Sequence, residues 1–144
     1  MIRSFALVLP CSFLVFACGQ PEGREGALMN PGDNCLTCHD GRNREAPAYT
    51  VAGTVFDTPT SPATSGVSGA TVIITDANQV ETRLTTNAAG NFYTGKAIAA
   101  PFSVAVERGG KRAAMASVPS TGGCATCHAN PPANSAPGRI YAAP

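Results

Sequence analysis

The sequence predicts a mainly β protein, a small antiparallel two-sheet sandwich of about six to seven strands. Between residues 49 and 118, apolar and polar residues alternate with a period of two, which is typical of half-buried strands. The 15 glycines and 12 prolines supply frequent turns. Charged residues make up only 13% of the chain and tryptophan is absent, a composition that favours short strands over amphipathic helices.

Six strands are expected in this region, each ending at a turn signal. In the clearest of them, Phe102, Val104 and Val106 share one face, and such one-sided strands pack as two layers. The expected strands are Tyr49–Phe56, Ala70–Thr75, Val80–Thr86, Asn91–Thr94, Phe102–Arg108 and Lys111–Val118.

The turns between the strands follow from Gly, Pro and Asx residues. Gly109-Gly110 is typical of a two-residue hairpin turn, because glycine adopts the positive φ angles that such turns require. A Pro/Ser/Gly-rich loop covers residues 57–69, and Asn and Gly delimit the turn at 87–90. The chain therefore reads as consecutive antiparallel strands.

Three motifs lie in this region: G-x-V at Gly53–Val55, G-A-T-V at Gly69–Val72 and a T-N-x-x-G-x-F turn at Thr86–Phe92. With these motifs, residues 49–118 resemble the carboxypeptidase-regulatory-like (prealbumin-like) β-sandwich. Asn87 stands where that turn commonly has Asp, and its side chain can form the same local hydrogen bond. The resemblance implies a scaffold that carries no reaction of its own.

Two Cys-x-x-Cys-His pentads flank the predicted sandwich. Two cysteines at this spacing reach both vinyl groups of a haem, and the histidine that follows reaches the iron. The sequence thus predicts two covalently bound haem c groups, with Cys35 and Cys38, and Cys124 and Cys127, as attachment residues and His39 and His128 as proximal iron ligands.

The cysteine pairs have two alternative interpretations. Four cysteines could form a zinc knuckle. An oxidising compartment, a histidine after both pairs and the lack of zinc-ribbon hairpins around them count against it. A thioredoxin-like redox pair is disfavoured because no βαβ pattern surrounds either site.

The distal face of each iron needs a ligand other than histidine, because His39 and His128 are the only two histidines. Met29 and Met115 each lie shortly before a pentad and are the candidate distal ligands. Filling of apolar space is the alternative role for each methionine, and their pairing with the haems stays open. Lys96 and Lys111 are weaker candidates for a distal ligand, because both are more simply interpreted as solvated charges.

Strand parity bears on the distance between the haems. An even number of antiparallel strands joined by short turns brings the start of the first strand and the end of the last to one end of the sandwich. Six strands therefore predict neighbouring haems, whereas seven would separate them.

Several arginines, the tyrosines and the proline-rich tail are expected to have supporting roles. Arg139 near the second pentad, and Arg42 or Arg44 near the first, are expected either to pair with a haem propionate or to be solvated. Tyr49, Tyr93 and Tyr141 are expected to pack, and the proline-rich tail at 131–144 to be irregular.

The N-terminus is typical of an exported lipoprotein. Residues 1–17 carry Arg3 before an apolar stretch too short to span a bilayer, and Val15–Cys18 resembles a bacterial lipobox. Cys18 is the expected lipidation site, residues 18–28 a flexible tether, and Gly19 favours the outer membrane, on its periplasmic or cell-surface face. The alternative is an ordinary signal peptide that leaves Cys18 as a free thiol.

The mature chain is expected to comprise a first haem segment (29–48), the sandwich (49–120) and a second haem segment with the tail (121–144). Cleavage of the signal leaves nine basic and nine acidic residues, so no basic surplus attracts nucleic acid.

With its two pentads and lipobox, the chain resembles small multihaem c-type cytochromes. This resemblance implies electron transfer between redox partner proteins at the cell envelope rather than enzymatic catalysis. The alternative is a haem-based sensor or a protein that binds small ligands or handles peroxide at an open iron site. The lack of a free histidine argues against the usual distal acid–base catalyst.

Overall fold

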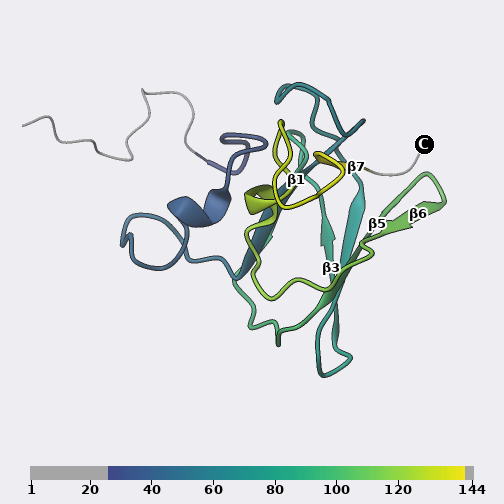
Figure 1. The fold of residues 1–144 in the computed structure, drawn as a ribbon. Helices are drawn as coiled ribbons and strands as arrows, with labels where there is room; N and C mark the ends of the chain where they lie inside the picture. Colours follow the sequence, from purple (N-terminus) through teal and green to yellow (C-terminus); the bar gives the residue numbers. More distant parts are fainter. Residues whose placement is uncertain (1–25, 142–144) are drawn as a thin grey trace, which may run out of the picture.

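The computed structural model describes residues 26–141, which form two β-sheets packed together (Figure 1). The expected signal peptide, the lipidation site Cys18 and most of the tether lie outside the described residues. The elements, in chain order, are the 3₁₀ turn η1 (Cys35–Thr37), β1 (Val51–Phe56), β2 (Thr71–Thr75), β3 (Glu81–Thr85), β4 (Asn91–Thr94), β5 (Ser103–Arg108), β6 (Lys111–Ala114), the 3₁₀ turn η2 (Cys124–Thr126) and β7 (Ile140–Tyr141).

The larger sheet has four strands in the order β3-β2-β5-β6, all antiparallel. The smaller sheet has three strands in the order β4-β1-β7, in which β4 is antiparallel and β7 parallel to β1. The mainly β, two-sheet fold class predicted from the sequence is therefore confirmed. No helix among residues 26–141 has the length and apolar character needed to cross a membrane.

The core lies between the two sheets. Val72 and Ile74 of β2 and Val104 and Val106 of β5 alternate along their strands and face Val51 and Val55 of β1, together with Phe92 and Phe102. This is the period-two pattern read from the sequence. Burial of such side chains contributes about 1.5–3 kcal/mol each, which holds the two layers together.

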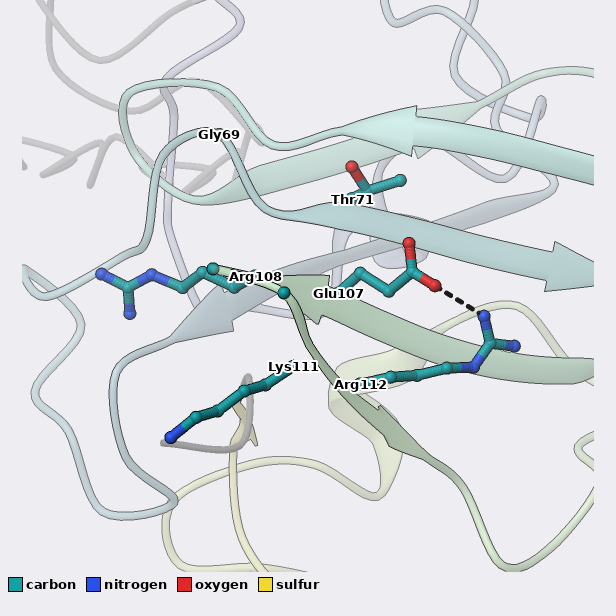
Figure 2. A pocket seen from close by; sticks show the side chains of 8 residues that line it. Gly69, Thr71, Glu107, Arg108, Lys111 and Arg112 are labelled. Carbon is teal, nitrogen blue, oxygen red and sulfur yellow. Dashed lines mark hydrogen bonds and ion pairs between the residues drawn. The ribbon is translucent and has the colours of Figure 1, made fainter.

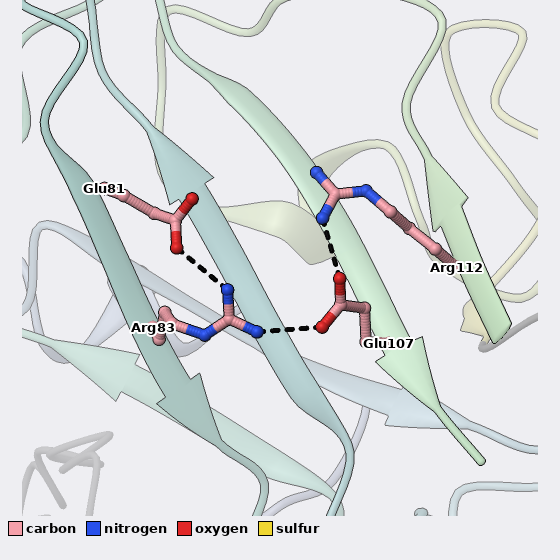
Figure 3. A network of polar contacts seen from close by, with 4 residues as sticks. All are labelled: Glu81, Arg83, Glu107 and Arg112. Atoms are coloured by element: carbon pink, nitrogen blue, oxygen red, sulfur yellow. Dashed lines mark hydrogen bonds and ion pairs between the residues drawn. The ribbon is translucent and has the colours of Figure 1, made fainter. Parts of the chain in front are cut away.

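The outer face of the four-stranded sheet carries a chain of ion pairs (Figure 3). Arg83 on β3 pairs with Glu81 and reaches across β2 to Glu107 on β5, both at 2.8 Å. Glu107 also pairs with Arg112 on β6 at 2.8 Å. This ion-pair chain is solvent-exposed and joins strands that are not all neighbours in the sheet.

Strand β1 is buried along its whole length. Val51 and Val55 belong to the core, whereas Thr54 accepts a hydrogen bond from the backbone nitrogen of Gly32 at 2.9 Å. Phe56 lies under the guanidinium of Arg139. The segments around the two pentads thus cover β1 and make it the platform of the candidate site.

The six predicted strands are all present, with ends that differ by a few residues. Asn91–Thr94 has the bounds predicted, and β1, β2, β3 and β5 start or end one or two residues inside the expected ranges. Gly109 and Gly110 both have positive φ angles, of 57° and 79°, as the hairpin turn requires. Asn87 accepts hydrogen bonds from Ala89 and Asn91 through its side-chain oxygen, so it supports its turn as predicted.

Two predictions about the C-terminal third were wrong. The last large strand was expected to run to Val118 but ends at Ala114, after which the nitrogen of Met115 donates to the carbonyl of Val104 at 2.9 Å and the carbonyl of Pro119 accepts from the nitrogen of Phe102 at 3.2 Å. From there the chain leaves the sheet edge to reach the second pentad. The tail was expected to be irregular, yet Ile140 and Tyr141 pair with Val55 and Phe56 as β7.

Candidate haem-attachment sites

The two pentads fold into the same local turn. In each, a 3₁₀ turn begins at the first cysteine, and the second cysteine caps it through a backbone bond of 3.2 Å to the carbonyl of the first. The nitrogens of His39 and His128 donate to that same carbonyl at 2.9 Å. Because residues i and i+3 of a 3₁₀ turn lie one above the other, both cysteine side chains leave the turn on one side.

Each histidine is held through its Nδ1 atom by a backbone carbonyl. His39 bonds to the oxygen of Pro47 and His128 to that of Gly138, both at 2.8 Å. A carbonyl only accepts, so Nδ1 carries the proton and the lone pair is on Nε2. Histidines that bind metals are commonly oriented in this way, so both imidazoles fit an iron ligand.

The first histidine is also fixed by aromatic stacking. The ring of His39 stacks on Tyr49 at 4.5 Å between centroids, and Tyr49 stacks on Tyr93 at 4.6 Å. The backbone nitrogen of Tyr49 donates to the carbonyl of His39 at 2.8 Å. These contacts agree with the packing role expected for Tyr49 and Tyr93, and they set the plane of the imidazole.

The pentads lie side by side against β1, on the side away from the β5–β6 hairpin (Figure 1). The side-chain nitrogen of Asn34 donates to Oγ1 of Thr126 at 3.3 Å, although 92 residues separate them in the chain. Asn34 also caps η1 by accepting from the backbone nitrogen of Leu36. A single side chain thus starts the first turn and contacts the second.

The second pentad is attached to β1 through backbone contacts. The nitrogen of Ala52 donates to the carbonyl of Gly122 at 3.0 Å, and Ala52 pairs with Gly123 as an isolated bridge. A Cβ atom at Gly122 would lie 1.9 Å from the carbonyl oxygen of Thr50. Only glycine permits this approach, so the Gly-Gly sequence before Cys124 positions the pentad.

The thiols of Cys35 and Cys124 are held in their protonated form. Burial, followed by the proximity of Cys35, raises the pKa of Cys124 to about 12. Burial also raises the pKa of Cys35. Reactive redox cysteines have lowered pKa values, so these sites do not resemble a thioredoxin-type pair.

A zinc knuckle is not assembled in the described part of the chain. Within residues 26–141, no three side chains of His, Cys, Asp or Glu come together as a group that could hold a metal ion. The four cysteines therefore do not form the tetrahedral cluster that structural zinc requires. A haem iron needs only one nitrogen from its own pentad, the Nε2 atom of the histidine, and each turn presents one.

The two methionines lie in different surroundings. Met29 is half-buried in a segment fixed to the smaller sheet, where its carbonyl accepts from the side chain of Asn91 at 2.9 Å. Met115 packs against the hydrophobic core at the end of β6. Its neighbours Ala114 and Ala116 are exposed, so Met115 lies on the side of this segment that faces the core.

The arginines also divide between surface and interior. Arg42 pairs with Asp40 and its side chain is 92% exposed, and Arg44 is exposed as well. Arg139, in contrast, is only 9% exposed. The solvated role considered for Arg139 is therefore wrong, whereas Lys96 and Lys111 are exposed as expected.

A surface cavity of about 430 Å³ lies away from the pentads, at the β5–β6 hairpin (Figure 2). Its walls include Thr71, Glu107 and Arg112, the last two of which form an ion pair. Arg108 at its edge is paired with Asp57 at 2.6 Å. Both arginines are thus paired with carboxylates, and the exposed Lys111 on the same lining adds a further positive charge.

Sequence reasoning missed several residues that shape the site. The bond between Asn34 and Thr126 and the bonds from the histidines to the carbonyls of Pro47 and Gly138 carry no sequence signal, because each joins residues at least 8 positions apart. The consecutive glycines Gly122 and Gly123 are the one signal that was readable, since paired glycines mark close backbone contacts.

Comparison of the chain with protein-family models, with curated proteins and with solved structures found no match. The candidate site therefore rests on its own geometry.

Proposed function

We propose that the chain is a membrane-anchored dihaem c-type cytochrome that carries electrons between redox partner proteins at the bacterial cell envelope. The observation that carries the proposal is the duplicated site. The same cysteine turn occurs twice, and in both copies a carbonyl holds Nδ1 of the histidine so that Nε2 is free for iron.

Each part of the site has a role in this proposal. The cysteine pairs form the thioether bonds, and His39 and His128 bind iron with a fixed ring orientation. The buried strand β1 supports both turns. The cofactors would therefore keep their positions when the oxidation state of the iron changes. When bound, haem supplies the one-electron redox chemistry, and the protein supplies burial, ligands and orientation.

The contact between the pentads supports electron exchange within the chain. Asn34 and Thr126 join the turns directly, and Cys35 lies close enough to Cys124 to raise the pKa of that thiol. Cofactors attached to adjacent turns would be neighbours, as strand parity predicts.

The cofactor is tested by producing the full chain in cells with a c-type haem maturation system. We expect a mass increase of two haems and a c-type reduced absorption spectrum. Replacing both cysteines of one pentad with Ala should remove one haem, and doing so in both pentads should remove both. A mature chain without covalently bound haem contradicts the proposal.

The location is tested by fractionation. Lipid attachment at Cys18 should place the protein in the outer-membrane fraction, and Cys18→Ala should release it to the soluble fraction. Soluble wild-type protein would contradict the anchor without affecting the haem assignment.

A second candidate function follows from the position of Met115. If Met115 stays in the core, Met29 is left as the methionine ligand for two irons, and one iron has an open site. Such a protein would bind a small ligand or handle peroxide. Rapid carbon monoxide binding by one reduced haem supports this candidate, whereas no binding supports a closed electron carrier.

A further inference from the structure

Arg139 is a buried cation directly before β7. Its backbone nitrogen donates to the carbonyl of Pro59 at 2.9 Å, and its side chain runs back over the smaller sheet. The guanidinium carbon lies 4.2 Å from the centroid of the Phe56 ring. This cation–π contact uses the face of the guanidinium and leaves its N–H groups free.

Two of those N–H groups lack an acceptor. Nε and Nη1 are buried and have no hydrogen-bond partner among residues 26–141. In that same range, the ion pairs of the structure involve other arginines. Arginine keeps its charge even when buried, and an uncompensated buried charge is strongly unfavourable. The position therefore calls for an anion.

The backbone of Arg139 adjoins the second haem segment, whereas its guanidinium lies between Phe56 of β1 and Gly32 of the first haem segment. Arg139 follows Gly138, whose carbonyl holds His128. On its other side, a Cβ at Gly32 would lie 2.1 Å from Nη1, so the backbone of the first segment touches the guanidinium. His39 is held elsewhere, by Pro47 and Tyr49 before the start of β1.

We propose that Arg139 binds a propionate carboxylate of the haem attached to Cys124 and Cys127. The proposal rests on the proposed function, because propionates are the carboxylates that haem brings to the site. Adjacent N–H groups of a guanidinium match the two oxygens of a carboxylate and form a charge-assisted pair. Arg139 is thus a positioning residue that balances the charge of the second haem.

The pair makes a measurable contribution to the reduction potential. A cation at the propionate stabilises the reduced haem, which has gained an electron, and it lowers the propionate pKa. In the holoprotein, Arg139→Gln should lower one of the two midpoint potentials and leave the other unchanged. Loss of the cation should also raise the propionate pKa, so that the pH range in which this potential changes moves toward neutral pH. Arg139→Lys keeps the charge and should restore most of the potential.

The matched control for charge is Arg42→Gln. It removes an arginine near the first pentad from an exposed pair with Asp40, and both potentials should stay as in the wild type.

A steric variant tests the same contact without changing Arg139. Gly32→Ala should displace the guanidinium and reproduce the potential shift of Arg139→Gln. Its control is Gly41→Ala, which has a similar φ of 85° against 88° but whose added Cβ meets only Ala48, at 3.4 Å. Gly41→Ala should leave both potentials unchanged.

The outcomes separate the two proposals. A wild-type chain that carries no haem contradicts the proposed function and this pair together. A chain with two haems whose potentials and pH dependence ignore Arg139→Gln contradicts only the pair. If Glu22→Gln with Glu25→Gln reproduces the shift and Arg139→Gln adds nothing further, the anion is a carboxylate of the chain and the propionate pair is overturned.

Discussion

At the scale of single residues, the candidate site depends on hydrogen bonds between side chains and backbone carbonyls. His39 and His128 each donate to a neutral carbonyl rather than to a carboxylate. A neutral acceptor gives the imidazole less anionic character than a carboxylate would, so it stabilises ferric iron less. In the proposed dihaem protein, these carbonyl acceptors would favour higher reduction potentials than carboxylate-bonded histidines would give.

Asn34 caps the first turn and bonds to the second. Asn34→Ala removes the cap of η1 and the bond to Thr126, and should lower the free energy of unfolding by about 1 kcal/mol. Thr126→Val removes only the bond between the turns and should cost less. Chemical denaturation of both variants measures the difference. Equal losses would show that the cap at Leu36 contributes nothing.

The two methionines should respond differently to truncation. Met29→Ala should change the spectrum of one haem by removing the far-red band typical of a methionine–iron bond. Met115→Ala should chiefly lower the free energy of unfolding, by about 1–2 kcal/mol, because half-buried side chains lose less than the buried ones. Absorption spectra and denaturation curves of both variants test this. If neither variant changes a spectrum, no methionine is a distal ligand.

At the scale of elements, β1 carries the site because both of its faces are covered. The core occupies one face, and the segments before the first pentad and around Arg139 cover the other. The alternation read from the sequence predicted a half-buried strand here, whereas β1 is buried at all of its residues, Thr54 included.

The close contact between Gly122 and β1 gives a prediction at this scale. In Gly122→Ala, a Cβ would meet the carbonyl of Thr50 at 1.9 Å, so the second pentad should shift away from β1. We expect a loss of about 1–3 kcal/mol in the free energy of unfolding.

The neighbouring variant Gly123→Ala is the control. Its Cβ would meet Oδ1 of Asn34 at 2.9 Å, which is the end of a side chain that can rotate. The cost of Gly123→Ala should be smaller, and a cost equal to that of Gly122→Ala would contradict the proposed docking.

The ion-pair chain across the larger sheet predicts a dependence of stability on pH. Hydrogen bonds from Arg112 and then Arg83 lower the pKa of Glu107 below its ordinary value of 4.5, against the opposing effect of burial. The carboxylate thus stabilises the fold above that ordinary value, and the contribution disappears as the pH falls through the lowered pKa.

Denaturation of Glu107→Gln and wild type across this acidic range should therefore show a difference that shrinks with falling pH. High salt should also reduce the difference, since the pairs are exposed. Glu45→Gln, at an exposed loop position, controls for loss of one negative charge. A difference that stays constant with pH would contradict the role given to the chain.

At the scale of the whole molecule, the fold joins the two ends of the described chain. The first pentad precedes all the strands, the second follows six of them, and both contact β1. Two haems attached there should interact. The Soret circular dichroism of the dihaem protein should therefore differ from the sum of the spectra of the two single-haem variants. A spectrum equal to that sum would contradict neighbouring haems.

The predictions that succeeded share a physical cause. The strands follow from alternation within six or so residues, and their turns from the backbone preferences of Gly109, Gly110 and Asn87. The pentads follow from the i to i+3 spacing of their cysteines. These are short-range properties, which a sequence shows directly.

The errors have the opposite cause. Ile140 and Tyr141 form a strand because they pair with Val55 and Phe56 at the edge of β1 opposite β4, far from them in sequence. Arg139 reads as a solvated cation, since nothing near it in sequence predicts that Phe56 and Gly32 enclose it. The early end of the last large strand, at Ala114 rather than Val118, depends on where the chain must turn toward the second pentad.

By itself, the sequence determined the mainly β sandwich, the six principal strands and two cysteine turns each followed by a histidine, because all of these depend on local spacing. Only the tertiary structure decided that the turns lie side by side, that carbonyls of Pro47 and Gly138 fix the histidines, and that Nε and Nη1 of Arg139 are buried without a hydrogen-bond partner among residues 26–141. The reason is that those contacts join residues far apart in the chain, and they exist only once the strands have brought both ends of the sandwich together.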